Sequence, residues 1–352
     1  MIVARAPYRV SFFGGGTDYP EWYSDHGGCF LSLAINHYCY ITLRVKPPFQ
    51  EKRYRVSWRI AEDVSDIKFI KHPIVRHSLE NMKVNSGLDI TYTGDLPGGS
   101  GLGSSSAFTV ALNHSLHAAN GYKPNQYELA NEAYEIERIK LEEIIGIQDQ
   151  IATAFGGFNH VVINRNGTYV IEKILLTKLQ LKKFLGRIIL VYTGISRLAS
   201  SVAEKKVKNI KQKTSIVSEM QDLVGDARSL LANERYDEFG KLLHKNWLLK
   251  KSISSVISTD VIDDIYDLAL KNGAIGGKLL GAGAGGFMLF FCKEGEKENN
   301  KPSPEPAEPD PIPPAPTDPD TFTMPSLDKI IVHHRTPRKT LYVPDEPVFQ
   351  SP

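Results

Sequence analysis

A glycine-rich loop that runs directly into a helix-like stretch is the most constraining feature of this chain. Residues 96–107 read LPGGSGLGSSSA, and a helical pattern continues from Phe108 to Asn120. Glycines let the backbone turn sharply and expose N–H groups to a ligand, while the first turn of a helix adds unpaired N–H donors and a positive dipole end. The segment therefore predicts a phosphate-binding loop. The alternative is a plain loop capped by Ser104 or Ser105.

The pattern differs from the Walker A loop, which requires a lysine after its second conserved glycine. Here Gly98 is followed five residues later by Gly103 and then directly by Ser104. An anion can still be held by backbone N–H groups alone. The segment therefore predicts a nucleotide loop of another type.

Length and composition restrict the class of protein. A chain of 352 residues, 41% of them hydrophobic, is large enough for two lobes that share a cleft. The formal net charge is only +2, and basic residues are interspersed with acidic ones. This balance argues against a nucleic acid or an anionic membrane as the main partner. A small anionic ligand is compatible with it.

The cysteines and the first residues indicate the compartment. Cys29, Cys39 and Cys292 are odd in number, far apart and outside any C-x-x-C pattern, so neither a disulfide framework nor a zinc site is expected. Met1 leads into Ile2–Arg5 without the charged and apolar regions of a signal peptide. We therefore expect a cytoplasmic protein.

Proline separates the end of the chain from the rest. Seven prolines fall in residues 1–301 and fourteen in residues 302–352. The run from Pro302 to Pro319 alternates proline with acidic and small residues, which favours extended, solvated chain and cannot bury a core. The fold is predicted to end near Asn300, and the remainder to be a linker or tail.

Periodicity within the first 300 residues predicts strands followed mainly by helices. Alternation predicts strands near 2–12 and 35–45, around a turn-rich segment 14–28, and apolar runs predict strands at 188–193 and 287–292. Three- and four-residue spacing predicts helices at 104–120, 126–145, 200–232, 236–255 and 259–271, the second of them stopped by Gly146. This order indicates an α+β fold in two lobes.

A second glycine-rich segment lies near the N-terminus. The predicted strand from Arg5 breaks into three glycines, Gly14–Gly16, which Thr17 and Asp18 follow. Such a turn offers directional hydrogen bonds to sugar hydroxyls and lets the backbone approach a ligand closely. The alternative is a β-bulge and turn in which Asp18 caps the next segment.

Carboxylates near the middle of the chain are candidates for chemistry. Asp149 comes just after a predicted helix and before a run of small residues, so it could accept or orient the proton of a reacting hydroxyl. Glu137, twelve residues earlier, could hold Mg²⁺ together with a serine hydroxyl of the glycine-rich loop. Glu142 and Glu143 are rivals for that role.

A third glycine-rich segment, 276–286, contains a literal G-x-G-x-x-G from Gly281 to Gly286. A dinucleotide-binding fingerprint must open a helix, whereas Phe287–Phe291 is an apolar strand, so the Rossmann interpretation is rejected. We expect a third loop that lines the same cleft. A glycine-rich hairpin that only packs is the alternative.

Together the three segments resemble the signature motifs of the GHMP kinase superfamily, in the same order. Residues 5–19 resemble the first motif, 96–107 the second and 278–287 the third. The resemblance implies a two-lobed fold, with a ribosomal-protein-S5-like N-terminal lobe (1–160) and a ferredoxin-like C-terminal lobe (161–298), before the proline-rich tail 299–352. It also implies that ATP and Mg²⁺ bind between the lobes.

The resemblance also implies roles for individual residues. ATP phosphates would contact the loop residues Gly99, Ser100, Gly101, Leu102, Gly103, Ser104 and Ser105. Ser105 and Glu137 would bind Mg²⁺. Asp149 would face the reacting hydroxyl, and Arg9 beside it would favour the ionised carboxylate and offset phosphoryl charge. The acceptor would contact Gly15, Gly16, Thr17, Asp18, Arg197 and Gly283.

Residues 13–19 lack the glutamate and histidine that galactokinases have before the Thr–Asp pair. With segments 70–76 and 155–159, this version resembles the bacterial D-glycero-D-manno-heptose 7-phosphate kinases and their L-fucose kinase relatives. That resemblance implies ATP-dependent phosphorylation of the anomeric hydroxyl to the 1,7-bisphosphate, for a nucleotide-activated heptose and surface glycan. Arg197, and Arg44 or Lys46, could supply cations for the substrate phosphate.

Two other functions stay open at this point. One is a 1-kinase for L-fucose or another hexose, and the other is a catalytically silent sugar sensor of the same fold. Retention of Arg9, Ser105, Glu137 and Asp149 favours an enzyme. ATP and a phosphorylated sugar are the expected partners, and a homodimer is compatible with the sequence. Family members follow the third-motif strand with a helix and a final strand, whereas residues 302–352 show no such helix pattern.

Overall fold

The computed structural model describes residues 1–195 and 207–295. Within these ranges the strands form one seven-stranded and one three-stranded sheet. The larger has the order β4-β3-β5-β2-β6-β7, with β1 also paired to β2, and the smaller has the order β8-β10-β9. The strands of the larger sheet are β1 (Ile2–Phe13), β2 (Gly28–Val45), β3 (Tyr54–Ser57), β4 (Ala61–Val64), β5 (Leu88–Gly94), β6 (Phe158–Ile163) and β7 (Tyr169–Lys173). Those of the smaller are β8 (Ile188–Tyr192), β9 (Ala274–Leu279) and β10 (Phe287–Cys292).

The long antiparallel pair of β1 and β2 organises the larger sheet. β2 pairs with β5 toward its C-terminal end and with β6 toward its N-terminal end. The β1–β2 register shifts between Pro7 and Arg9 and again between Ser11 and Phe13. Such irregularities change the direction in which a neighbouring side chain points. Arg9, which follows the first shift, is buried despite its charge.

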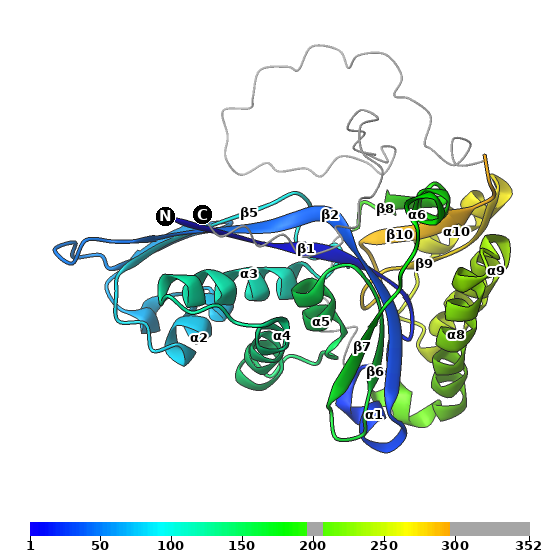
Figure 1. The fold of residues 1–352 in the computed structure, drawn as a ribbon, viewed down its shortest axis with the longest axis horizontal. Coiled ribbons are helices and arrows are strands. Elements are labelled where there is room, and N and C mark those ends of the chain that lie inside the picture. The colour runs from blue at the N-terminus through cyan, green and yellow to red at the C-terminus, as the bar shows by residue number, and fades with distance from the viewer. Residues whose placement is uncertain (196–206, 296–352) are drawn as a thin grey trace, which may run out of the picture.

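Helices flank the two sheets on different sides. Figure 1 shows α2 to α5 gathered along one side of the larger sheet, and α9 and α10 beside the smaller one. α8 packs against α9 and against β1 and β2 of the larger sheet. α3 packs on β1 and β2, and α9 packs on β9 and β10. The helices are α1 (Pro20–His26), α2 (Pro73–Asn81), α3 (Ser104–Ala119), α4 (Gln126–Tyr134), α5 (Gln148–Phe155), α6 (Lys178–Leu185), α8 (Thr214–Ala232), α9 (Tyr236–Ile253) and α10 (Asp260–Lys271), with short 3₁₀ and π segments η1 (Ile67–Phe69) and η2 (Glu135–Lys140).

The larger of two apolar clusters among the described residues joins the two sheets. Phe184 of α6 lies at its centre and contacts Phe12 of β1, Phe239 of α9 and Phe291 of β10, with ring centroids 5.7, 5.3 and 5.5 Å away. All four side chains are fully buried. Because aromatic rings from both sheets pack on one another, the arrangement of the two lobes is fixed by apolar contacts as well as by the chain connection.

The prediction of one helix over 126–145 is wrong in its second half. α4 ends at Tyr134, and the chain continues as the π segment η2 only to Lys140. The N–H of Leu141 donates to the carbonyl of Ile136, a five-residue step, and Glu142 then adopts a φ of 55°. A π turn widens the helix and allows the neighbours Ile136 and Glu137 both to be buried, which a regular amphipathic helix does not favour.

Three smaller expectations also need correction. The turn-rich segment 14–28 contains the helix α1, Asp149 lies inside the first turn of α5 rather than after a helix, and Gly276–Leu279 belongs to β9. The predicted helices 104–120, 236–255 and 259–271 are confirmed as α3, α9 and α10, to within two residues at each end. The start of the predicted helix 200–232 and the tail 299–352 lie outside the described residues.

The α+β class and the two-lobed arrangement are confirmed. The predicted lobe boundary after residue 160 stays a prediction; β6 crosses it, and β7 also pairs with the larger sheet. All three cysteines are free thiols, as the sequence predicts. Among the described residues, none of the helices combines the length and apolar character needed to span a membrane.

Candidate active site

Four segments that are distant in the sequence line one cleft between the sheets. They are the end of β1 with the first glycine loop (residues 14–18), the phosphate loop with the start of α3 (97–106), the stretch from η2 to α5 (137–150), and the third glycine loop (280–286). Tyr19 and two lysines, Lys250 of α9 and Lys278 of β9, complete the lining. The three glycine-rich segments therefore meet at one place.

The phosphate loop ends directly at the N-terminus of α3. Gly99, Gly101 and Gly103 have φ of 71°, 77° and 74°, a left-handed conformation that glycine adopts without steric cost. All three line the cleft, as do Ser104 and Ser105 in the first turn of α3. The unpaired N–H groups and dipole of that turn favour an anion at this point.

Two residues of the phosphate loop support it from outside the cleft. Ser100 and Leu102 are buried and do not line the cleft. The carbonyl of Ser100 accepts from the N–H of Phe287 at 3.0 Å, and that of Leu102 accepts from the N–H of Arg9 at 3.0 Å. Their backbone therefore ties the loop to β10 and β1.

The phosphate loop and the third glycine loop touch through bare backbone. A Cβ on Gly101 would lie 2.7 Å from the carbonyl oxygen of Leu280, and a Cβ on Gly281 would lie 2.7 Å from the Cα of Gly101. Real Cβ atoms do not approach so closely. Glycine is therefore required at both positions for the two loops to form one wall of the cleft. Gly283 lies in the same wall.

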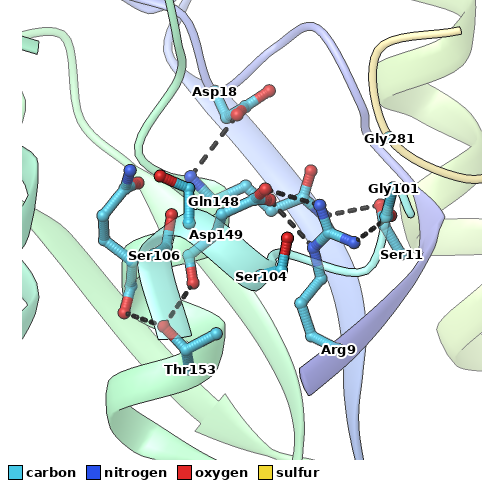
Figure 2. Close-up of polar contacts among 12 residues, drawn as sticks. Arg9, Ser11, Asp18, Gly101, Ser104, Ser106, Gln148, Asp149, Thr153 and Gly281 are labelled. Atoms are coloured by element: carbon cyan, nitrogen blue, oxygen red, sulfur yellow. Dashed lines mark hydrogen bonds and ion pairs between the residues drawn. The ribbon is translucent and has the colours of Figure 1, made fainter. Parts of the chain in front are cut away.

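Arg9 and Asp149 form a two-point ion pair in the cleft. The Nε and Nη2 of Arg9 donate to Oδ1 and Oδ2 of Asp149 at 2.8 and 2.5 Å, and Nη1 donates to the carbonyl of Gly101 at 2.6 Å. Figure 2 shows the guanidinium between the carboxylate and the phosphate loop. The Arg9 side chain is 4% exposed and that of Asp149 is 34% exposed. The carboxylate is thus held in a fixed orientation and is open to a ligand.

Glu137 is buried beneath the start of α3. Its carboxylate accepts hydrogen bonds from Ser106 at 2.9 Å, from Thr109 at 2.5 Å and from Gln150 at 2.5 Å. The contact from the hydroxyl of Ser105 is longer, at 3.5 Å. Burial raises the pKa of Glu137 to about 7, and the hydrogen bonds from Thr109 and Gln150 act against that rise.

Ser105 and Glu137 suit a magnesium ion. They present hydroxyl and carboxylate oxygens, which Mg²⁺ prefers, and the long contact from Ser105 leaves a lone pair of the carboxylate weakly used. Among residues 1–195 and 207–295, no three His, Cys, Asp or Glu side chains gather as metal ligands. A site here would need phosphate oxygens and water to complete it. Of the rivals, Glu143 lines the cleft and Glu142 does not.

Some residues of the first glycine loop line the cleft, and others hold the loop in place. Gly15 and Asp18 line the cleft, and Asp18 accepts from the N–H groups of Gly16 and Gln148 at 2.9 and 3.4 Å. Gly16 itself does not line the cleft. Thr17 is fully buried, and its hydroxyl contacts the carbonyls of Gly14 and Cys29 at 2.9 and 2.7 Å. It therefore fastens the loop to β2 instead of facing a ligand.

The structure requires glycine at position 146 for a packing reason that the sequence did not reveal. Gly146 was expected to stop a helix, but a Cβ at this position would lie 2.0 Å from Oδ2 of Asp18. Only glycine allows Asp18 to pack against this segment. The glycine thus helps to place a cleft carboxylate.

Two of the three cations expected for a substrate phosphate lie away from the cleft. Arg44 pairs with Asp89 on the larger sheet at 3.1 Å, and Lys46 approaches Asp63 at 3.9 Å; neither lines the cleft. Arg197 lies outside the described residues. The sequence reasoning missed Lys250. Its helical spacing from Asn246 on a buried face was the available signal, since a lysine on such a face needs partners.

Comparison with known proteins identifies similar chains. The N-terminal domain of the GHMP kinases matches residues 68–157 and their C-terminal domain matches residues 227–301. D-glycero-alpha-D-manno-heptose 7-phosphate kinase of Campylobacter jejuni is 30% identical over 85% of this chain and 91% of its own length. The bifunctional fucokinase/GDP-fucose pyrophosphorylase of Arabidopsis thaliana is 27% identical over 83% of this chain, which spans 30% of that protein. A crystal structure of a D-glycero-D-manno-heptose 1-phosphate kinase from Bacteroides thetaiotaomicron has a TM-score of 0.70 at 23% identity, covering 85% of this chain and 91% of that one.

Proposed function

The chain belongs to the GHMP kinase family, and we propose that this sugar kinase transfers the γ-phosphoryl group of ATP to the anomeric hydroxyl of D-glycero-D-manno-heptose 7-phosphate. The product is the 1,7-bisphosphate, a precursor suited to nucleotide activation. The similarity to the Campylobacter jejuni heptose 7-phosphate kinase supports this acceptor. The observation that carries the chemistry is the Arg9–Asp149 pair beside the phosphate loop.

The phosphate loop is the proposed ATP site. Backbone N–H groups around Gly99, Gly101 and Gly103, with the first turn of α3, hold the phosphates. Ser105 and Glu137 hold Mg²⁺, which, when bound, neutralises charge on the phosphate oxygens. Ser100 and Leu102 support this site through their backbone.

Asp149 and Arg9 act at the acceptor hydroxyl. The hydroxyl oxygen forms a bond to the γ-phosphorus while the bond from that phosphorus to the β–γ bridging oxygen breaks, and ADP leaves. Asp149 orients the hydroxyl and takes its proton, which then passes to solvent. Arg9 holds the carboxylate in place and offsets negative charge on the transferring group. Positioning of this kind is the main demand of phosphoryl transfer.

The sugar is held between the first and the third glycine loops. Gly15, Asp18 and Gly283 face it directly, with Gly16 and Thr17 fixing the loop that carries Asp18. Arg197 stays a predicted ligand of the 7-phosphate. Reaction in the cytoplasm and a homodimeric state stay predictions as well.

The test is incubation of the purified chain with Mg-ATP and one acceptor at a time, followed by ³¹P NMR. The acceptors are heptose 7-phosphate, the unphosphorylated heptose, L-fucose, galactose and mannose. A new anomeric phosphate signal with heptose 7-phosphate alone is expected. A signal with L-fucose or another free sugar would reassign the acceptor, and no transfer to any of them would favour the sugar-sensor function.

A further inference from the structure

Beneath the cleft, α9 contacts the backbone where two strands open into glycine loops. Asn246 and Lys250, one turn apart, are both buried. The Nδ2 of Asn246 donates to the carbonyl of Phe12 at 3.2 Å, at the end of β1. The Nζ of Lys278 donates to the same carbonyl at 3.0 Å. One helix face therefore reaches the base of the first glycine loop.

Lys250 makes the corresponding contacts at the base of the third glycine loop. Its Nζ donates to the carbonyls of Leu279 and Gly281, at 2.9 and 2.8 Å. These carbonyls lie on either side of Leu280, the residue at which β9 gives way to the loop. The side chain is only 3% exposed, so the ammonium group has left bulk water and depends on protein partners.

We propose that Lys250 is a positioning residue that holds the third glycine loop against the phosphate loop and thereby sets the affinity for the nucleotide. The inference rests on the proposed function in that it takes the phosphate loop as the ATP site. It does not depend on which sugar is the acceptor.

The route from Lys250 to the phosphate loop is short and continuous. Lys250 fixes the carbonyl of Gly281, and Gly281 packs on the backbone of Gly101 so closely that neither residue has room for a Cβ. Gly101 in turn accepts from Arg9. Displacing the third glycine loop would therefore alter the position of a loop that offers N–H groups to phosphate, and would disturb one anchor of the Arg9–Asp149 pair.

The charge of Lys250 matters as well as its hydrogen bonds. Lys250 lines the cleft together with Asp18, Glu137 and Asp149. A charged ammonium at this position would add positive potential to the site. Hydrogen bonds from a charged donor to carbonyls are stronger than neutral ones. An uncharged apolar side chain of similar length would lose both effects while filling the same space.

The test compares Lys250→Met and Lys250→Arg with the matched control Lys251→Met. Lys251 is the next residue on α9, but it pairs with Asp263 at 2.6 Å and does not line the cleft. Calorimetry measures the affinity for Mg-AMPPNP, hydrogen exchange measures amide protection at residues 280–286, and steady-state kinetics give kcat and the KM of each substrate.

For Lys250→Met we expect about tenfold weaker binding of Mg-AMPPNP, the scale of one charge-assisted hydrogen bond, with faster exchange in the third glycine loop. The KM for the sugar should rise by less than this factor, because Gly283 is the one residue of that loop proposed to contact the sugar. Lys250→Arg should recover part of the affinity, and Lys251→Met should match wild type. If Lys250→Met does not fold, Lys250→Gln provides the same comparison.

Unchanged nucleotide affinity, or a loss confined to the KM of the sugar, would overturn the inference. A purely structural role in α9 would lower thermal stability without the split between nucleotide and sugar. Nucleotide binding and amide exchange need no acceptor, so they remain decisive even if wild-type protein fails to phosphorylate heptose 7-phosphate. That failure would remove the proposed acceptor only.

Discussion

At the scale of single residues, Asp149 is the side chain on which the proposed chemistry depends most. Asp149→Asn keeps the shape and one acceptor for Arg9 but removes the charge that takes the proton. We expect kcat to fall about 10²–10⁴-fold, with nucleotide and sugar binding within a few-fold of wild type. Steady-state kinetics and calorimetry measure these quantities. Asp89→Asn, which removes a carboxylate paired with Arg44 away from the cleft, is the control and should leave kcat unchanged. Unaltered turnover in Asp149→Asn would exclude Asp149 from the mechanism.

His72 provides a residue-scale prediction about pH. It stacks on Phe108 at 4.7 Å and caps α2, and burial lowers its pKa from 6.5 to about 4. Between these values the unfolded chain binds a proton on His72 that the folded chain does not, so the contribution of His72 to the free energy of unfolding should decrease as the pH falls from 6.5 toward 4. Glu137, with its raised pKa, contributes with the opposite sign. His72→Asn keeps a capping acceptor without titrating, so in urea unfolding its stability should fall less, or rise more, than that of wild type over this pH range. His37→Asn, at an exposed position, is the control that should keep the pH dependence of wild type. An equal pH dependence in His72→Asn and wild type would disprove the assignment.

At the scale of elements, the contact between the phosphate loop and the third glycine loop can be tested with two glycines of similar conformation. Gly101 and Gly121 have φ of 77° and 72°, but a Cβ would meet the Leu280 carbonyl at 2.7 Å in the first case and nothing within 4 Å in the second. Both alanine variants should lose about 1 kcal/mol of stability from the backbone conformation. Only Gly101→Ala should also lose nucleotide affinity, by more than tenfold. Thermal unfolding and calorimetry separate the two effects, and equal affinities would show that the close packing is dispensable.

The elements also show what the sequence could predict and what it could not. The three glycine-rich segments were recognisable because their turns depend on local residue type, and the structure brings all of them to one cleft. The π segment η2 was not predictable, because it is stabilised by burial of Glu137 under Ser106 and Thr109 of another helix. The contacts of Lys250 likewise depend on where α9 packs, which periodicity does not reveal. Gly146 was noticed for the wrong reason, since its partner is Asp18, far away in the sequence.

At the scale of the whole molecule, the shared core predicts that the two sheets unfold together. Phe184 contacts rings from β1, α9 and β10, so Phe184→Ala should cost about 3–5 kcal/mol. Denaturant unfolding should stay a single transition, with protection of β5 and β10 lost at the same denaturant concentration. Leu175→Ala, at a side chain that is 86% exposed, is the control and should be neutral. Separate transitions for the two sheets would show that each lobe has an independent core.

One wall of the cleft is formed by two loops that lie about 180 residues apart in the sequence. This separation determines when, during synthesis, the cleft can form. The wall of the cleft needs Gly101 and Gly281, which are brought into contact only after β9 and β10 have been made. Chains emerge from the ribosome N-terminus first, at about 5–20 residues per second. A nascent chain that has completed α3 carries its phosphate loop for some seconds without the backbone that supports it. If the phosphate loop is the nucleotide site, as we propose, a nascent chain would bind nucleotide at full affinity only after translation has passed the third glycine loop.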